Sequence, residues 1–188
     1  MPANPSMPPR LPPPRQPSGP YRVCMVCLGN ICRSPMAEIV LRDELARGGL
    51  AEAVSVDSAG TGDWHIGERM HAPAREELAG RGYDGSGHRA RQIQPSWLGS
   101  YDLLVAMDRN NLASLRRMAP PEDAARIRLL RSFDPALAAD DPYEGQVPDP
   151  YGAPQEYYAL ALDLVQAGAR GLARQLAELL DPAAQPRA

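Results

Sequence analysis

The stretch from Tyr21 to Met36, YRVCMVCLGNICRSPM, decides the fold of this chain. Its first part, Tyr21–Val26, is an apolar run rich in valine and cysteine, which is typical of a buried strand. Ser34 and Pro35 then predict the start of a helix, because serine is a good N-cap and proline fits the first helical position. We therefore expect a strand, a tight loop beginning at Cys27 and a helix in direct succession.

The rest of the chain repeats this alternation. Apolar runs and helical periodicity predict strands at Val54–Ser58, Tyr101–Met107 and Ile127–Leu130, and helices at His71–Arg81, Asn110–Met118 and Pro154–Leu180. Strands that alternate with helices predict a three-layer α/β/α domain around a four-stranded, parallel, flavodoxin-like sheet. Ligands of such sheets bind beyond the carboxyl ends of the strands, which is where Cys27 is expected.

The composition indicates one domain and limits its partners. A chain of 188 residues with 44% hydrophobic residues suits a single domain with a full core. The formal net charge of -3 argues against nucleic acid or an anionic membrane as the main partner. Three clustered cysteines, Cys24, Cys27 and Cys32, indicate reactive thiols in a reducing compartment, so we expect the cytoplasm. The sequence shows no secretory signal, although a non-classical secretion route stays open.

Both ends of the chain differ from its centre. Residues 1–20 contain nine of the 21 prolines and few bulky apolar residues, so they are predicted to form a disordered tail. Residues 182–188 are predicted to be a frayed C-terminus, which leaves 21–181 as the domain. A polyproline II ligand for an aromatic groove is the alternative interpretation of the N-terminal tail.

The loop from Cys27 to Ser34 has the chemistry of an anion site. Its backbone amides can converge on one anion, and the following helix N-terminus adds partial positive charge, which favours the thiolate form of Cys27. Arg33 offers a planar fork that matches two phosphoryl oxygens. Gly29 and Asn30 tolerate the left-handed backbone of a tight cradle. Ser34 can donate a hydrogen bond to the thiolate.

Other interpretations of this loop are weaker. A buried strand followed by a capped helix, with incidental cysteines, would explain the pattern without any chemistry. Cys24 and Cys27 could form a redox pair, but Cys24 falls inside the apolar run and is predicted to be a packed core thiol. A P-loop nucleotidase is excluded, because the chain has neither the glycine-lysine motif nor any lysine.

The loop Cys27–Ser34 resembles the signature of the low-molecular-weight protein tyrosine phosphatases. The likeness extends from about Tyr21 to Leu180, with ordered matches at Asp57–Thr61, Asp63–His65, His88–Gln92, Ala106–Asp108 and Val147–Gly152. It implies that a tyrosine-phosphorylated protein is the substrate and that Cys27 forms a cysteinyl-phosphate. It also implies no metal or other cofactor, and it makes a cognate tyrosine kinase a candidate partner.

The resemblance also implies an aspartic acid that protonates the leaving oxygen, and the chain contains Asp-Pro-Tyr twice. We assign the acid to Asp149, because Val147–Gly152 lies shortly before the C-terminal helix as the family pattern requires. Asp141, in the other copy, follows Ala138–Asp140 and is predicted to lie in an exposed acidic loop without a part in the reaction.

The remaining site residues also rest on the resemblance. Ser58 and His88 would hold Asn30 in a strained conformation, and Cys32 would form a reversible disulfide with Cys27. Gly152 stands where some members have a second tyrosine that is phosphorylated, so that mode of control is not expected. The phosphate-binding loop comprises Leu28, Gly29, Asn30, Ile31, Cys32, Arg33 and Ser34, and the pocket rim would comprise Leu28, Ile31, Trp64, His65 and Tyr151.

Three alternatives remain. A thioredoxin-coupled arsenate reductase needs two further cysteines downstream, and the chain has none after Cys32. Protein-arginine phosphatases tend to carry threonine where Ile31 stands, and the larger side chain should crowd phosphoarginine. The third alternative is a phosphate-binding module without turnover.

Overall fold

The computed structural model describes residues 10–181, so residues 1–9 of the predicted N-terminal tail and the predicted C-terminal tail at 182–188 lie outside the described residues. The sheet of this part of the chain has four parallel strands in the order β2-β1-β3-β4. Their bounds are β1 Tyr21–Cys27, β2 Val54–Gly60, β3 Leu103–Ala106 and β4 Ile127–Leu129. The predicted four-stranded parallel sheet is confirmed.

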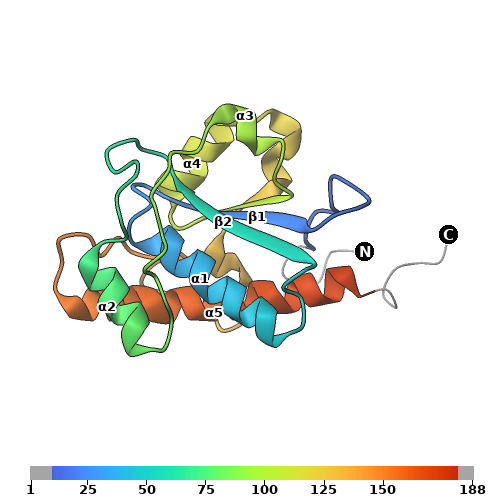
Figure 1. Cartoon of the computed structure of the whole chain (residues 1–188). Helices are drawn as coiled ribbons and strands as arrows, with labels where there is room; N and C mark the ends of the chain where they lie inside the picture. The colour runs from blue at the N-terminus through green and yellow to red at the C-terminus, as the bar shows by residue number, and fades with distance from the viewer. Residues whose placement is uncertain (1–9, 182–188) are drawn as a thin grey trace.

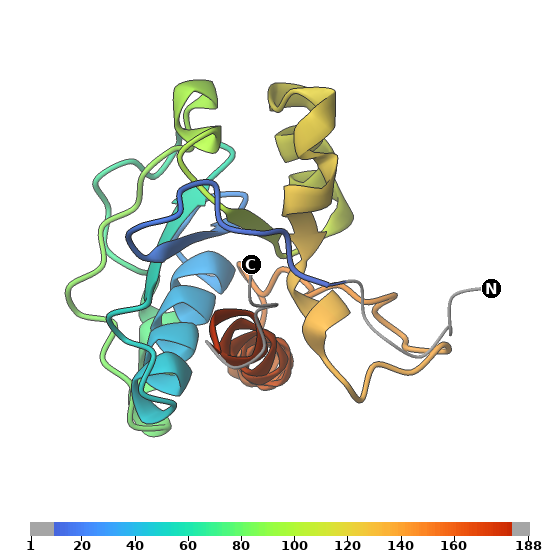
Figure 2. The same ribbon diagram turned by 90° about the vertical axis from the view of Figure 1, so that its right-hand side faces the viewer.

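Helices cover both faces of the sheet (Figures 1 and 2). One face carries α1 (Arg33–Arg47), α2 (Ala72–Gly80) and α5 (Gln155–Leu180), and the other carries α3 (Pro95–Leu98) and α4 (Arg109–Met118). Residues of β1 alternate between two hydrophobic clusters, because successive side chains of a strand point to opposite faces. The three-layer α/β/α prediction is therefore confirmed.

The start of α1 differs from the prediction. The helix begins at Arg33, and Cys32 occupies the N-cap position without a side-chain capping bond. Ser34, which we expected to be the N-cap, lies inside the first turn and is buried. Its hydroxyl lies 3.0 Å from the Cys27 sulfur, so it serves the loop in place of the helix end.

Short elements were not predicted. These are α3 and the two 3₁₀ helices, η1 (Pro121–Arg126) and η2 (Leu130–Phe133). The η2 segment lies against α5 at Gly171, where an added Cβ would come within 1.7 Å of the Phe133 carbonyl oxygen. The close approach of two backbones therefore depends on glycine at this position.

Residues 10–20 lie against the domain, which differs from the predicted disordered tail. Leu11 is buried, and the Tyr21 hydroxyl donates to the Pro12 carbonyl at 3.0 Å. The Arg15 amide donates to Asp102 Oδ1 at 2.6 Å, and the Arg15 side chain pairs with Asp123 at 2.7 Å. Figure 1 shows this blue segment beside the start of β1. Ion pairs and hydrogen bonds thus hold this segment on the domain, although its proline-rich composition predicts a disordered tail.

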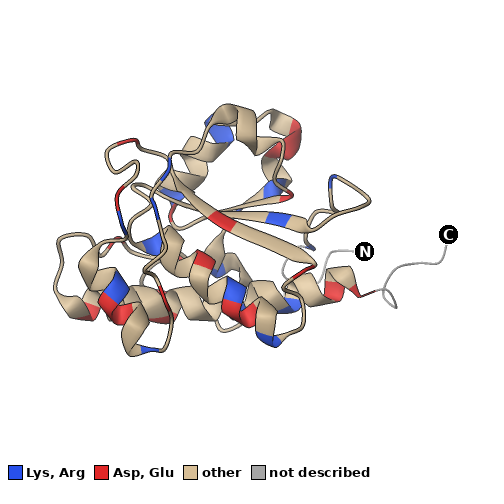
Figure 3. Cartoon of the chain, viewed as in Figure 1, with Lys and Arg blue, Asp and Glu red and all other residues tan. Residues whose placement is uncertain are grey.

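Acidic and basic residues are interspersed along the helices (Figure 3). On α1, Arg42 pairs with Glu38 and Arg47 pairs with Asp43, each one turn apart. No helix within residues 10–181 combines the length and apolar character needed to cross a membrane.

Candidate active site

Cys27 is the last residue of β1 and lies at the carboxyl end of the sheet. Its side chain is buried, and its sulfur accepts a hydrogen bond from the Asn30 amide at 3.3 Å. The Ser34 hydroxyl lies 3.0 Å from the same sulfur. The strand, the loop and the first turn of α1 thus place two hydrogen-bond partners around one thiol.

Backbone amides of neighbouring segments donate hydrogen bonds to the carbonyl groups of the loop. The Cys27 and Leu28 carbonyls accept from the Thr61 and Gly62 amides at 2.9 Å each. The Ile31 carbonyl accepts from the His71 amide at 2.8 Å. Because surrounding segments hold the carbonyls, the loop can present its amides, and the N-terminus of α1, to an anion.

Asn30 has a left-handed backbone, with φ of 56°, as the sequence predicted for this position. Its side-chain amide donates to Ser58 Oγ and to Ser34 Oγ, each at 2.9 Å. His88 Nε2 donates to its carbonyl at 2.6 Å. The structure therefore brings Ser58 and His88 to Asn30, as expected.

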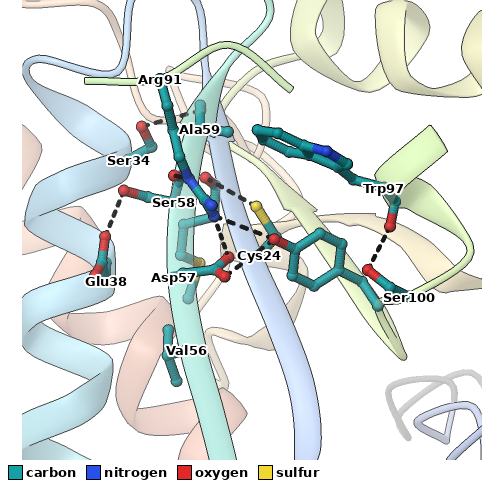
Figure 4. Close-up of polar contacts among 12 residues, drawn as sticks. Cys24, Ser34, Glu38, Val56, Asp57, Ser58, Ala59, Arg91, Trp97 and Ser100 are labelled. Carbon is teal, nitrogen blue, oxygen red and sulfur yellow. Dashed lines mark hydrogen bonds and ion pairs between the residues drawn. The ribbon is translucent and has the colours of Figure 1, made fainter. Parts of the chain in front are cut away.

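A second layer of contacts, which the sequence did not predict, supports these partners. The Arg91 amide donates to Asn30 Oδ1 at 2.9 Å, and the Ser58 hydroxyl donates to the Glu38 carboxylate. Figure 4 shows Ser58 between Glu38 and Arg91, and the Arg91 guanidinium beside Asp57. Arg91 Nε also donates to the Ser58 carbonyl at 2.8 Å.

The Arg33 guanidinium is buried between two carboxylates. Nη1 donates to Asp108 Oδ2 at 2.6 Å and to the Val147 carbonyl at 3.1 Å, while Nη2 donates to Asp149 Oδ2 at 2.8 Å. Burial acts to lower the Arg33 pKa, but the charges of Cys27, Asp149 and Asp108 outweigh it and raise the pKa. Nε is buried without a hydrogen-bond partner among the described residues. Such an orphaned donor is suited to an anion in the loop.

Asp108 was not assigned a role from the sequence, although it follows β3 at the carboxyl edge of the sheet. It also caps α4, because its side chain accepts from the Asn111 amide at 2.7 Å. Its position beyond the end of a strand was the signal that could have identified it.

The two Asp-Pro-Tyr aspartates have different partners. The Asp149 side chain is 41% exposed and reaches Arg33, which places it at the candidate site. The Asp141 side chain is only 11% exposed and pairs with Arg131 at 2.7 Å. The prediction of an exposed acidic loop was therefore wrong for Asp141, because its carboxylate pairs with Arg131, a buried arginine of the preceding η2 segment.

Most of the predicted rim residues surround the loop at the surface. Leu28, Tyr151 and Trp64 are exposed, and 67% exposure rules out a core role for Trp64. His65 lies over Gly29, because an added Gly29 Cβ would come within 2.9 Å of the His65 ring. Ile31 is only 5% exposed and packs against the core, so it differs from the exposed rim residues, and its part in the pocket stays a prediction.

Two neighbours of the rim were not predicted. Ile66, which follows His65 in the sequence, is exposed. His71 lies 5.0 Å from the Tyr151 ring, and its Nδ1 is 3.0 Å from the Tyr158 hydroxyl. His71 thus joins the loop after Asp149 to α5.

The other two cysteines are buried free thiols. Cys24 faces the α3–α4 side of the sheet, so the prediction of a core thiol is confirmed. Burial raises the pKa of both Cys24 and Cys32 above the ordinary thiol value. The Cys27–Cys32 disulfide stays a prediction. Within residues 10–181, no three histidine, cysteine, aspartate or glutamate side chains gather as a metal site would require.

Comparisons with known proteins agree on one family. The family model described as low molecular weight phosphotyrosine protein phosphatase matches residues 22–181. A low molecular weight protein-tyrosine-phosphatase of Streptomyces coelicolor is 49% identical over 162 residues, covering 86% of this chain and 96% of that protein. Low molecular weight protein-tyrosine phosphatase A of Mycobacterium tuberculosis is 47% identical over 137 residues, covering 70% and 82%. A crystal structure of a protein tyrosine phosphatase from Entamoeba histolytica aligns with a TM-score of 0.78 at 29% identity, covering 84% of this chain and 97% of that one.

Proposed function

Because the chain belongs to the low molecular weight protein tyrosine phosphatases, we propose that it hydrolyses phosphotyrosine in proteins through a phosphate ester of Cys27. The observation that carries the proposal is the position of the Arg33 side chain. Arg33 is the first residue of α1, at the end of the Cys27 loop, and its guanidinium donates a hydrogen bond to Asp149. The nucleophile, the phosphate-binding group and the acid are therefore joined through one side chain.

In the first step, phosphoryl oxygens bind the loop amides, Arg33 Nε and Arg33 Nη2, and they replace Asp149 as the acceptor of Nη2. The Cys27 thiolate attacks phosphorus in line, so the sulfur–phosphorus bond forms as the bond to the tyrosine oxygen breaks. Protonated Asp149 gives its proton to that leaving oxygen. The amides and the guanidinium stabilise the charge that is spread over the transferring group.

In the second step, the Asp149 carboxylate takes a proton from water as the water oxygen attacks phosphorus. The sulfur–phosphorus bond breaks, and inorganic phosphate and the Cys27 thiolate are released. The Ser34 hydroxyl, 3.0 Å from the sulfur, stabilises the thiolate as it leaves. Ser58 and His88 contribute by holding Asn30 and thus the shape of the loop.

The exposed rim supports an aryl phosphate as the substrate. Trp64, Tyr151 and His65 offer flat faces near the loop, and the His65 and Tyr151 rings lie 6.0 Å apart. Aromatic side chains of this kind pack well against a phenyl ring. We therefore propose that the substrate is a tyrosine-phosphorylated protein and that a cognate tyrosine kinase produces it. We also propose that the protein acts in the cytoplasm.

The test is hydrolysis of p-nitrophenyl phosphate and of a phosphotyrosine peptide by the wild type and by Cys27→Ser. We expect the wild type to hydrolyse both substrates and Cys27→Ser to hydrolyse neither. Cys24→Ser is the control, because Cys24 lies on the opposite face of β1, and the folded protein of this variant should keep its activity. A phosphoarginine protein is the comparison substrate. Preference for phosphoarginine, or activity that survives in Cys27→Ser, would overturn the proposal.

A further inference from the structure

The first Asp-Pro-Tyr copy, at residues 141–143, lies in the segment between η2 and α5 that also carries Asp149. Arg131 Nη1 donates to Asp141 Oδ2 at 2.7 Å, and the Gly145 amide donates to the same oxygen at 2.8 Å. These two hydrogen bonds hold the pKa of Asp141 below its usual value, so the carboxylate stays charged. One oxygen atom therefore joins η2 to the turn that ends at Gly145.

That turn has an unusual backbone. Glu144 and Gly145 both have left-handed conformations, with φ of 51° and 74°. A non-glycine residue in this conformation is strained and persists only where its surroundings hold it. The Glu144 amide donates to the Asp141 carbonyl at 2.9 Å, and Arg131 Nη1 also reaches the Gln146 carbonyl at 3.4 Å. Asp141 and Arg131 thus supply several of the contacts that hold the turn, beside the ion pair between Arg109 and Glu144.

The anchor for the turn is rigid. Arg131 is buried on η2, and η2 lies against α5 at Gly168 and Gly171. An added Cβ at Gly168 would come within 2.8 Å of the Leu130 carbonyl oxygen, so the two backbones are in close contact. The Arg131 guanidinium therefore offers Asp141 a fixed point in the core.

Only residues 146–148 separate the turn from Asp149. Within them, Val147 is buried, its amide donates to the Met107 carbonyl at 2.8 Å, and its carbonyl accepts from Arg33. The turn and Asp149 thus lie on one short segment, and Val147 joins that segment to Arg33. We propose that Asp141 is a positioning residue for the reaction: paired with Arg131, it fixes the turn at residues 144–145 and thereby the position of the Asp149 carboxyl relative to the leaving oxygen.

This inference rests on the proposed role of Asp149 as the general acid. An acid matters more for a basic leaving group, which needs a proton to depart, than for an acidic one. The test therefore compares kcat/KM for phenyl phosphate with kcat/KM for p-nitrophenyl phosphate, whose leaving phenol is more acidic. In Asp141→Asn we expect a loss of about tenfold for phenyl phosphate and about twofold for p-nitrophenyl phosphate, as a small misplacement of a catalytic group would cause. The loop still binds phosphate, so KM should change little.

The ratio of the two losses separates positioning from a general loss of structure. Partial unfolding of Asp141→Asn lowers both values of kcat/KM by the same factor, and this factor cancels in the ratio. Asp140→Asn is the matched control, because Asp140 is adjacent in the sequence and exposed. It should leave the ratio at the wild-type value, and Asp141→Glu, which keeps the charge, should recover part of it.

Asp149→Asn calibrates the experiment. It should change the ratio more than Asp141→Asn does. If Asp149→Asn changes the ratio and Asp141→Asn leaves it at the wild-type value, the positioning role of Asp141 is wrong and the proposed acid stands. If Asp149→Asn leaves the ratio unchanged, the assignment of the acid fails, and the inference about Asp141 fails with it.

Discussion

At the scale of single residues, Asn30 shows how the loop keeps its shape. Its left-handed backbone is strained for a non-glycine residue, and four side chains or backbone groups hold it. The partners come from α1, β2 and the segment that follows α2, so elements distant in the sequence stabilise one conformation. Loss of a partner should therefore change the loop without removing any group that contacts phosphate.

We expect His88 to make the stability of the folded protein depend on pH. Burial lowers its pKa and outweighs the hydrogen bond to Asn30, which acts to raise it; Glu38 also raises the pKa, while Arg89 and Arg91 lower it. When folding lowers the pKa of a histidine, the free energy of unfolding is highest at pH values above the unfolded pKa of about 6.5. It decreases as the pH falls from about 6.5 through the folded pKa, because the unfolded chain binds the proton more readily.

We therefore expect the free energy of unfolding in urea to decrease from pH 7.5 to pH 5.5, and to decrease less in His88→Gln. Glutamine can still donate to the Asn30 carbonyl but does not titrate. His65 and His71 are present in both proteins, so their contributions cancel in the comparison. Equal slopes for the wild type and His88→Gln would contradict the prediction.

At the scale of elements, Gly171 decides how closely α5 approaches η2. Helix propensity alone predicts that Gly171→Ala stabilises α5 by about 1 kcal/mol. The structure predicts the opposite sign, because the new Cβ would meet the Phe133 carbonyl oxygen, a backbone atom that cannot move alone. We expect a net loss of about 1–3 kcal/mol in the free energy of unfolding, measured by chemical denaturation.

Gly80→Ala is the control for this prediction. Gly80 is the last residue of α2, and an added Cβ would have no neighbour within 4 Å. Its stability should stay the same or rise slightly, because alanine restricts the unfolded chain. Stabilisation by both substitutions would show that the contact between α5 and η2 is looser than the structure indicates.

The helices and strands also differ in how well the sequence predicts them. Long periodic segments such as α5 and the buried strand β1 were located, because their patterns are local. The helix start at Ser34 was misplaced, because its hydroxyl binds Cys27 in place of capping the helix. The partners of Arg33 could not be predicted from local patterns, because they are set by the packing of segments distant in the sequence. The Arg131–Asp141 pair was missed because it depends on the fold of an irregular segment without a periodic pattern.

At the scale of the whole molecule, the segment at residues 10–20 and the active site lie at opposite ends of the sheet. The segment contacts the start of β1, and Cys27 ends the same strand. A strand of seven residues separates them by about 20 Å. A change in the segment should therefore affect stability and leave the reaction unchanged.

Arg15→Ala tests this separation. Arg15 Nε donates to the Tyr101 carbonyl at 2.7 Å, and the guanidinium pairs with Asp123 at 2.7 Å, so the substitution removes two contacts between the segment and the domain. We expect a loss of about 1–3 kcal/mol in the free energy of unfolding, because charged hydrogen bonds that are partly buried are lost. Gln16→Ala, at an exposed neighbouring position, should unfold like the wild type. The kcat/KM for p-nitrophenyl phosphate should be equal in all three proteins. Wild-type stability in Arg15→Ala would show that the segment does not hold to the domain, in agreement with the disordered tail that the composition predicted.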